Sequence, residues 1–377
     1  MRTLFLEYFY LKGNQGAIYA ARTHINLFSK LSEEFTLVYP VKKGKEPEGI
    51  YTDKIKMIPV EDYRSKIRKF IDLCLGKVHR YHLDDSFFDR SKFDVVVFDS
   101  SAVSARLIKK FRSAGLRTIT IHHNYQIEYL LGDCNKLLLL PTLLWTWIYE
   151  RQSVRYSDLN LTLTSQDSEL LRGHYDINAQ FATLGVFDSQ PQTYPCITKQ
   201  ERGHVFLSTG GLAAKQNEDS IIPFLKNCYP VLKEVDAFSQ LIFAGRNPSK
   251  KLIKAINNAG ATVIPSPQEM SPILVKGDYF LCPTDRGGGL KLKILDGLKY
   301  GMIVLTHEVS ARGYEKMKEL GALYSYNDIV SFRDSLEKAQ KSKITHLQIQ
   351  KIYVENFSFE KGVIRLKEIL WNNSLLL

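Results

Sequence analysis

The sequence predicts an α/β protein built from two doubly wound domains that face each other across a cleft. Continuous apolar runs rich in β-branched residues alternate with helical segments, which is typical of parallel strands buried on both faces. The same alternation starts again in the second half, after a polar, proline-bearing stretch at 189–195 that resembles a linker. The chain of 377 residues, 44% hydrophobic and 24% charged, is long enough for two domains with full cores.

The elements follow in order along the chain. In the first half, strands are expected at 3–9, 35–39, 94–98, 118–121 and 159–164, and helices at 17–31, 102–112 and 142–157. Residues 42–93 are expected to be irregular apart from an amphipathic piece at 64–75. In the second half, strands are expected at 205–208, 241–244, 262–264, 279–282 and 302–306, and helices at 217–233, 250–259 and from about 290 to 301. We therefore expect domains at 1–188 and 196–356, followed by a C-terminal segment, 357–377, whose amphipathic helix crosses back to the first domain.

Composition limits the class of protein. Five cysteines are widely spaced without a CxxC pair, which argues against a disulfide scaffold or a zinc site and for a reducing cytoplasm. The first nine residues are typical of a strand rather than a signal peptide. The net charge of +11 favours anionic partners such as a nucleotide or a lipid surface, although a solvated basic surface explains it equally well. Nucleic acid is not expected, because aromatic residues do not alternate with the basic ones.

Two segments bear on membrane attachment. The apolar run at 137–149 is too short to span a bilayer, and the piece at 64–75 is basic and amphipathic. Both fit an anionic membrane surface as a partner, and both fit ordinary helices with one packed face. The expected location is cytoplasmic, or peripheral on the inner membrane face.

The most informative stretch is a strand, a glycine-rich loop and a helix at 280–301. Gly287, Gly288 and Gly289 let the backbone approach an anion closely, and Lys291 and Lys293 add positive charge. The loop follows a strand, and α/β sheets bind ligands at the carboxyl ends of their strands. This pattern predicts a phosphate or diphosphate site without a Walker sequence.

Two further loops follow strands in the second half. One contains Gly210 and Gly211, and the other contains Gly245 and Arg246. In a parallel sheet these loops and the glycine-rich loop lie on one edge, facing the expected cleft. An arginine at this edge can hold a diphosphate with two parallel hydrogen bonds, whereas a lysine acts as a point charge.

These strings resemble a known family. The stretches at 245–249 and 283–301 are similar to those of nucleotide-sugar glycosyltransferases with the GT-B fold, of the large retaining family 4, also called group 1. Shorter likenesses fall at 209–211, 217–219, 165–167 and 311–313. The resemblance covers most of the second domain and the first domain loosely. It implies two Rossmann-like domains, with the acceptor on the side of the first and the nucleotide sugar in the second.

The resemblance implies roles for individual residues. Arg246 and Lys293 would bind the donor diphosphate and neutralise the leaving nucleoside diphosphate, so that neither a metal nor a cofactor is needed. Asp296 would hydrogen-bond the donor ribose, while Gly288 stands where family members commonly carry a glutamate. The donor is expected to be a UDP- or GDP-sugar. The expected contacts to its diphosphate and nucleotide are Gly16, Gly210, Gly211, Arg246, Arg286, Gly287, Gly288, Gly289, Leu290, Lys293 and Asp296.

In the first domain, a pair of histidines follows the strand at 118–121 directly. A histidine at such a strand end is well placed to touch substrate, and the resemblance supports a catalytic histidine here, with His123 favoured over His122. The expected contacts to the acceptor or sugar are Asn14, His122, Asn124 and Glu128. The remaining histidines are expected to be structural or to lie on the surface: His24, His79, His82, His174, His204, His307 and His346.

The predicted function is transfer of a sugar from a nucleotide donor to a glycan or a lipid-linked saccharide, with retention. A nucleotide-sugar epimerase remains an alternative, although the few carboxylates near the glycine-rich loop argue against it. A non-catalytic protein of the same architecture also remains open, because Gly288 replaces the common glutamate. A nicotinamide dehydrogenase is disfavoured, because neither half has GxGxxG after its first strand.

Overall fold

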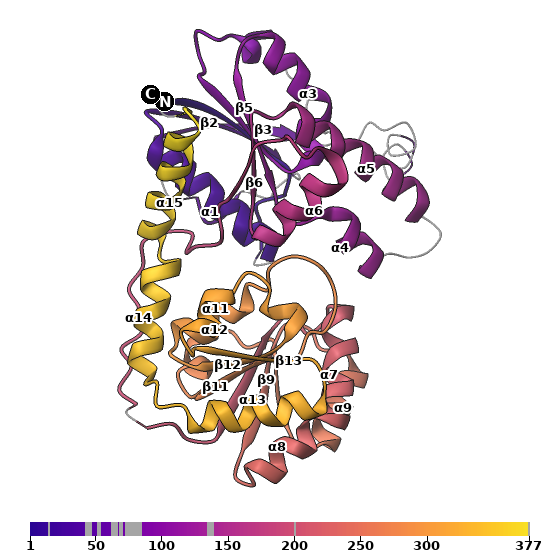
Figure 1. Cartoon of the computed structure of the whole chain (residues 1–377), viewed down its shortest axis with the longest axis vertical. Helices are drawn as coiled ribbons and strands as arrows, with labels where there is room; N and C mark the ends of the chain where they lie inside the picture. Colours follow the sequence, from indigo (N-terminus) through magenta and orange to yellow (C-terminus); the bar gives the residue numbers. More distant parts are fainter. Residues whose placement is uncertain are drawn as a thin grey trace. The chain divides into compact units, whose positions relative to one another are not determined.

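The computed structural model describes residues 1–13, 16–41, 47–50, 54–61, 67, 71, 85–133, 139–199 and 201–375. The chain divides into two compact units, one made of Met1–Gln192 with Phe357–Leu377 and the other of Thr193–Asn356. Each unit has a parallel sheet with helices on both of its faces (Figure 1). This architecture confirms the predicted α/β class with two doubly wound sheets.

The first unit contains a seven-stranded sheet in the order β3-β2-β1-β4-β5-β6-β7. Its strands are β1 (Arg2–Glu7), β2 (Glu34–Val41), β3 (Ile55–Glu61), β4 (Val95–Asp99), β5 (Arg117–His122), β6 (Leu159–Thr162) and β7 (Phe181–Thr183). Its helices are α1 (Gly16–Leu31), α3 (Ser101–Ser113), α4 (Gln126–Asp133), α5 (Leu139–Tyr156), α6 (Ser165–Tyr175) and α15 (Phe359–Asn372), with a 3₁₀ turn, η1, at Asp85–Phe88. The strand order reverses between β1 and β4, which is where doubly wound sheets bind ligands.

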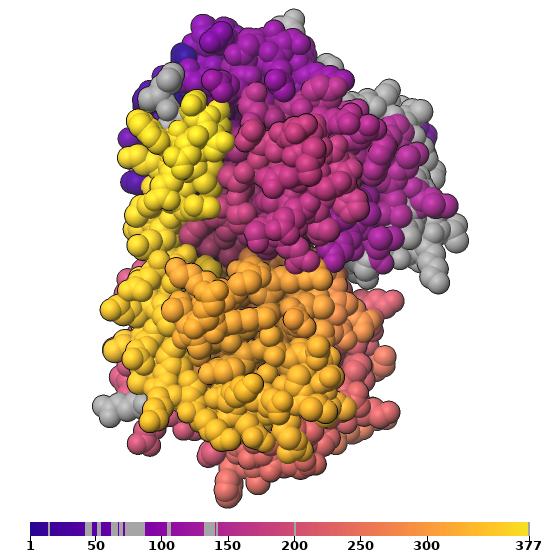
Figure 2. Space-filling view, viewed as in Figure 1, coloured from indigo at the N-terminus to yellow at the C-terminus, as the bar shows by residue number. Residues whose placement is uncertain are grey.

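The C-terminal helix α15 packs on the first unit, as predicted. Its apolar side joins the core that contains Phe5 of β1 and Phe28 of α1. At Gly362 a Cβ atom would lie only 2.7 Å from the Phe187 ring, so a glycine lets the helix approach closely. In Figure 2 the yellow C-terminal residues lie on the surface beside the purple and indigo residues of this unit.

The structure differs from the predicted elements in several places. Residues 55–61, expected to be irregular, form β3, which pairs with β2 at the edge of the sheet. Its Pro59 obscures the strand pattern, but an edge strand tolerates proline because one side of its backbone is unpaired. Helices α4 and α6 and the short strand β7 were not predicted either. In the second unit, the strand at Leu323–Tyr326 and the helices at Ser271–Leu274, Glu315–Glu319, Ile329–Lys341 and His346–Phe357 were also not predicted. The helix after the glycine-rich loop begins at Lys293 rather than near Leu290.

The second unit contains a six-stranded sheet in the order β10-β9-β8-β11-β12-β13. Its strands are β8 (Val205–Gly210), β9 (Gln240–Gly245), β10 (Thr262–Pro265), β11 (Tyr279–Cys282), β12 (Ile303–His307) and β13 (Leu323–Tyr326). Its helices are α7 (Lys215–Asn227), α8 (Tyr229–Val235), α9 (Lys250–Asn258), α10 (Ser271–Leu274), α11 (Lys293–Lys299), α12 (Glu315–Glu319), α13 (Ile329–Lys341) and α14 (His346–Phe357), with a 3₁₀ turn, η2, at Glu308–Ala311. The order reverses between β8 and β11, so the loops after these strands meet at the reversal point.

Helix α11 lies tightly against the strand that precedes it. A Cβ atom at Gly297 would lie 2.5 Å from Cβ of Phe280 in β11, so this helix position requires glycine. Gly301 then ends the helical segment with φ of 71° and leads into β12. The close packing holds the start of α11, and Lys293 with it, at the edge of the sheet. Among the described residues, none of the helices combines the length and the apolarity that crossing a bilayer requires.

Candidate functional site

The three predicted loops of the second unit follow neighbouring strands, β9, β8 and β11. Gly210 and Gly245 are paired across β8 and β9, and a Cβ atom on Gly245 would lie 1.8 Å from the Gly210 carbonyl oxygen. The two backbones therefore touch where the strands end, and Gly245 has no room for a side chain. Arg246 follows at once, with an exposed side chain and its backbone N–H bonded to the Gly210 oxygen at 3.2 Å.

Lys293, the first residue of α11, is held by two neutral oxygens. Its Nζ donates to Oγ1 of Thr284 at 2.8 Å and to Oδ1 of Asn217 at 3.0 Å. Its aliphatic chain passes Gly210, where a Cβ atom would lie 3.5 Å from Cδ of the lysine. No carboxylate of the described residues forms an ion pair with this ammonium, so its position is set while its charge is not cancelled. Such a charge is well suited to a phosphate group.

Arg286 is bound differently from Lys293. Its Nε donates to Oδ1 of Asp285 at 2.8 Å, its Nη2 donates to Oδ2 at 3.3 Å, and Asp219 lies 3.8 Å from its Nη1. Burial of Asp285 opposes its ionisation, but hydrogen bonds from Arg286 and Ser220 lower its pKa overall. Two carboxylates therefore balance the Arg286 charge, and the side chain holds the loop in this structure.

The glycine-rich loop folds back on one of its own lysines. Gly287 and Gly289 have φ values of 80° and 74°, which favour glycine. Nζ of Lys291 donates to the carbonyl oxygens of Gly287 and Gly288, both at 3.3 Å. Leu290 continues the loop toward α11 and is half-buried. The charge of Lys291 thus stabilises the loop, and Lys293 is the lysine left beside the neighbouring strand ends.

Other predicted positions lie apart from these contacts. Asp296 is in the first turn of α11 and is exposed. Gly211 has open space where a Cβ atom would be, so the backbone beside Gly210 is accessible. Gly16 is the exposed first residue of α1. Asn14 and nearly all of the segment 64–75 lie outside the described residues.

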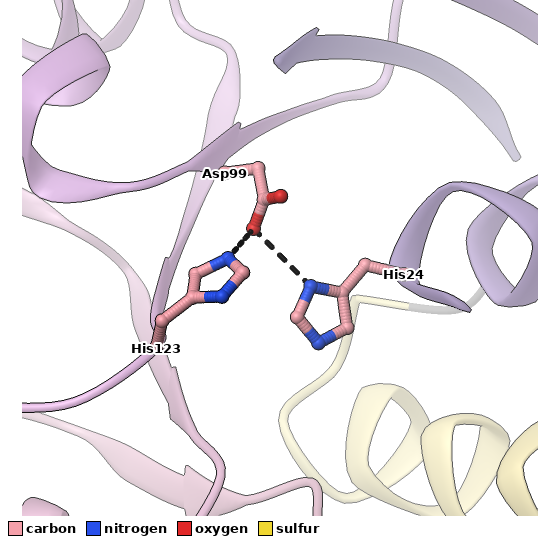
Figure 3. Close-up of side chains that lie close together, drawn as sticks. All are labelled: His24, Asp99 and His123. Carbon is pink, nitrogen blue, oxygen red and sulfur yellow. Dashed lines mark hydrogen bonds and ion pairs between the residues drawn. The ribbon is translucent and has the colours of Figure 1, made fainter. Parts of the chain in front are cut away.

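In the first unit, a cluster of buried side chains gathers where the strand order reverses. Asp99 ends β4, and its Oδ1 lies 2.7 Å from Nε2 of His123 and 3.2 Å from Nδ1 of His24 (Figure 3). His24 comes from α1, and His123 directly follows β5. One oxygen of Asp99 and one ring nitrogen of each histidine lie within 4.8 Å of one another. Two hydrogen bonds to the same carboxylate oxygen explain this spacing, and a metal ion would also fit it.

The pKa values in this cluster move in opposite directions. Burial opposes ionisation of Asp99, but the two imidazoles outweigh burial and lower its pKa. Burial, together with the Asp99 charge, raises the pKa of Glu7 well above its ordinary value. Burial lowers the pKa of His24, so that its ring is neutral at neutral pH. A single carboxylate, on Asp99, therefore remains among these buried groups.

A cavity of about 260 Å³ opens beside this cluster. Aromatic side chains form much of its wall, including Phe9 and Trp145, and His123 and Asn124 reach it as polar groups. Oδ1 of Asn124 is buried and has no hydrogen-bond partner among the described residues. An apolar wall with a few polar groups is typical of a site for a small ligand.

The other residues predicted for this region differ in whether they line the cavity and in how far their side chains are exposed. His122 also lines it but is buried, and its Nε2 lies 3.0 Å from Oδ1 of Asn160. Burial lowers the pKa of His122 to about 4, so it is a neutral ring that donates to Asn160. Glu128 is in the first turn of α4 and is not among the cavity-lining residues. His123, with 12% of its side chain exposed, is therefore the more available histidine.

Sequence reasoning missed the acids of this site. Glu7 and Asp99 are the last residues of two apolar strands, β1 and β4, which pair at the reversal point. That placement was a usable signal, because ligands bind there. Glu150 was also missed: it is buried in α5, lines the cavity, and accepts hydrogen bonds from the Gln126 N–H and the Tyr175 hydroxyl, both at 2.9 Å.

Comparisons with known proteins agree with this architecture. Residues 203–341 match the family described as glycosyl transferases group 1. Sucrose-phosphate synthase from Thermosynechococcus elongatus is 9% identical over 99% of each chain, with a TM-score of 0.69. A mutant of TarM from S. aureus is 10% identical over 98% of this chain and 99% of its own, with a TM-score of 0.65. HepE from Anabaena, solved with UDP and glucose, is 12% identical over 99% of this chain and 100% of its own, with a TM-score of 0.64. No curated protein matches significantly.

The chain thus has the GT-B fold of glycosyltransferases, as its resemblance predicted. The structural likeness covers both units, and the match to group 1 glycosyl transferases covers most of the second. The structural likeness shows the fold, and the family match likens residues 203–341 to group 1 glycosyl transferases.

Proposed function

We propose that this protein transfers a hexose from a nucleoside-diphosphate sugar to a glycan or lipid-linked saccharide, with retention. The observation that carries the proposal is the ammonium of Lys293, held by Thr284 and Asn217 at the reversal point of the second sheet. It lies in the segment that matches group 1 glycosyl transferases. Retention is supported by the sequence resemblance to the retaining family 4.

The proposed chemistry depends on stabilising the leaving group. Breaking the bond between the sugar and the diphosphate places negative charge on the departing nucleotide. Fixed positive groups aimed at such a charge commonly supply the largest part of catalysis. Lys293 and Arg246 would bind the diphosphate, which makes a metal ion unnecessary there, and Asp296 would bind the ribose. Gly210, Gly211 and the loop 286–290 would contact the donor through their backbone.

Two solved relatives of the fold support a nucleotide-sugar donor. HepE was solved with UDP and glucose, and a trehalose-6-phosphate protein from E. coli was solved with UDP-2-fluoro glucose. We propose that the donor here is a UDP- or GDP-sugar. WaaB, a lipopolysaccharide outer core galactosyltransferase, has the same fold and supports a saccharide acceptor linked to lipid.

The cavity of the first unit is the proposed place for the sugar that reacts. Its volume of about 260 Å³ suits one sugar ring with a few hydroxyl contacts. His123 would act at the reacting sugar, and Asn124 offers a buried oxygen that a hydroxyl can satisfy. Contacts from His122, Glu128 and Asn14 to the acceptor belong to the same proposal.

We also propose peripheral attachment to the inner face of a membrane from the cytoplasm. Leu140, Leu144 and Trp147 recur at helical spacing on α5 and are exposed by 79%, 56% and 41%. Arg151 stacks on Trp147 with its guanidinium carbon 5.1 Å from the ring centroid. An apolar stripe next to a basic residue suits an anionic membrane surface, where a lipid-linked acceptor would be found.

Two steps test the proposed function. A thermal-shift panel of nucleoside diphosphates and nucleotide sugars should identify the base, because binding to the native state raises Tm. The donor so identified is then incubated with and without saccharide acceptors, and NMR follows the nucleotide and the anomeric proton. Release of nucleoside diphosphate that depends on acceptor, with a retained anomeric configuration, is expected. An epimer formed without acceptor would favour an epimerase, and binding without turnover would favour a non-catalytic protein.

A further inference from the structure

Two buried acids and a strained backbone conformation lie together at the carboxyl ends of β1 and β4, and each of them destabilises the folded state. Glu7 and Asp99 are register partners at the carboxyl ends of these strands, and both are buried. The next residue, Ser100, has φ of 114°, a conformation that residues with side chains rarely adopt. Buried acids and a strained turn each cost stability, and such strain is found at functional sites. The combination is explained if it serves the cavity that Ser100 and His123 line.

The hydrogen bonds of Asp99 assign the protons of both histidines. An ionised carboxylate oxygen can only accept, so each ring nitrogen next to Oδ1 must carry a hydrogen. His24, being neutral, therefore has its proton on Nδ1, 3.2 Å from Oδ1. By the same rule His123 has a proton on Nε2, 2.7 Å from Oδ1. In neutral His123 the lone pair is consequently on Nδ1.

The surroundings of His123 leave Nδ1 for a ligand. None of the hydrogen bonds within the described part of the chain involves Nδ1. The centroid of the His123 ring lies 5.1 Å from that of Phe9, with the two rings at 62° to each other, and the backbone N–H of Phe9 donates a 2.6 Å hydrogen bond to Glu7. The centroid of the His24 ring lies 5.2 Å from that of His123, in an edge-to-face arrangement. These contacts restrict the plane of the imidazole while its side chain reaches the cavity.

We propose that Asp99 is a positioning residue that fixes His123 in one tautomer, in which Nδ1 accepts a hydrogen bond from a hydroxyl of the bound sugar. His24 supplies the second donor to Asp99, and Glu7, in its neutral form, adds no second negative charge. The proposal rests on the proposed function, because it needs a hydroxylated ligand at His123. It adds two residues, Asp99 and His24, that make this histidine an acceptor.

The first test reads the tautomer directly and needs no substrate. Two-bond ¹H–¹⁵N correlation spectra of histidine-labelled protein distinguish protonated from unprotonated ring nitrogens, and the His123→Gln variant assigns the signal. We expect His123 of the native protein at neutral pH to carry its proton on Nε2. A proton on Nδ1 with a bare Nε2 would overturn the proposal, whether or not the protein transfers sugars.

The second test changes Asp99. In Asp99→Asn the amide can present its NH₂ group to His123 and reverse the tautomer, so we expect kcat to fall about 100-fold or more. Asp158→Asn is the matched control: this carboxylate accepts from the Thr118 N–H at 2.8 Å in the same sheet, but lies before β6, at the opposite edge. It should keep kcat.

His24→Gln separates the roles within the cluster. Glutamine retains an N–H donor for Asp99, so the His123 tautomer and most of kcat should persist. Wild-type kcat in Asp99→Asn, or a loss of kcat without a change in the His123 spectrum, would contradict the proposal. So would an equivalent of zinc that copurifies with the native protein and is lost from His24→Gln, because the metal would then orient His123. Absence of transfer by the native protein would contradict the proposed function but leave the tautomer measurement valid.

Discussion

Lys293 donates a hydrogen bond of 2.8 Å from its Nζ to Oγ1 of Thr284. The lysine begins α11 and the threonine lies in the loop after β11, so the bond fixes the ammonium at the end of the strand. Asn217 of α7 accepts a second bond from the same nitrogen at 3.0 Å. Neutral partners orient the charge without cancelling it, which is what an anion site requires.

Replacing Lys293 by methionine should lower kcat about 100- to 1,000-fold, because a fixed positive group near the leaving diphosphate is lost. Steady-state kinetics with the donor identified by thermal shift will measure this loss. Lys226→Met, which removes an exposed charge from α7, is the control and should retain wild-type kinetics. Near-normal transfer by Lys293→Met would contradict the proposed role.

Arg246 is expected to depend on its geometry as well as its charge. Arg246→Ala should lower kcat severely, and Arg246→Lys should recover only part of the loss, because lysine cannot form two parallel hydrogen bonds to a diphosphate. Donor titrations of both variants, with nucleoside diphosphate release as the readout, will compare them. Equal activity of Arg246→Lys and wild type would show that charge alone is sufficient.

Substituting alanine for Gly245 should lower stability, whereas the same substitution at Gly211, in the adjacent loop, should not. In Gly245→Ala the new Cβ would lie 1.8 Å from the Gly210 oxygen, so the free energy of unfolding should fall by about 3 kcal/mol or more. Gly211→Ala has open space and should leave stability nearly unchanged, while donor binding weakens if the backbone there contacts the donor. Denaturant unfolding and donor binding are the measurements. A stable Gly245→Ala protein would show that the loops do not touch as described.

Glu150 predicts a pH dependence of stability. Burial raises the pKa of this carboxyl to about 8, so the native state keeps a proton that the unfolded chain releases near its ordinary pKa. Its contribution to stability is complete below about pH 4.5 and is lost as the pH rises through about 8. Relative to Glu150→Gln, wild type should lose up to about 1.4 kcal/mol of unfolding free energy per pH unit in this window. If the unfolding free energies of wild type and Glu150→Gln changed equally with pH, the raised pKa of Glu150 would be contradicted.

The apolar stripe on α5 predicts membrane binding. The double variant Leu144→Ser, Trp147→Ser should bind anionic lipid vesicles more weakly than wild type in a sedimentation assay, with Tm unchanged because both side chains are exposed. Phe238→Ser, which removes an apolar side chain exposed by 80% in the second unit, is the control. Unchanged vesicle binding by the double variant would show that the apolar stripe on α5 does not bind the membrane.

Sequence patterns predicted the architecture and the arrangement of the three loops that make up the candidate site of the second unit. Continuous apolar runs such as that of β4 indicated parallel strands, because strands buried on both faces need apolar residues throughout. The glycines and cations near Gly210, Arg246 and Lys293 could be expected on one edge, since parallel strands end on the same side. Strand β3 was not predicted, because Pro59 and the exposed side chains of this edge strand remove the continuous apolar pattern that indicated the other strands.

The sequence by itself therefore determined the α/β class, the repeated sheet and the cationic, glycine-rich loops, because these depend on local periodicity and strand ends. Only the tertiary structure decided which side chains meet. Asp99 contacts His24 and His123 from separate elements, and Arg286 of the glycine-rich loop pairs with Asp219 of α7. Such contacts depend on strand order and on desolvation. Burial and the neighbouring imidazoles separate the pKa values of Glu7 and Asp99, and no local pattern carries that information.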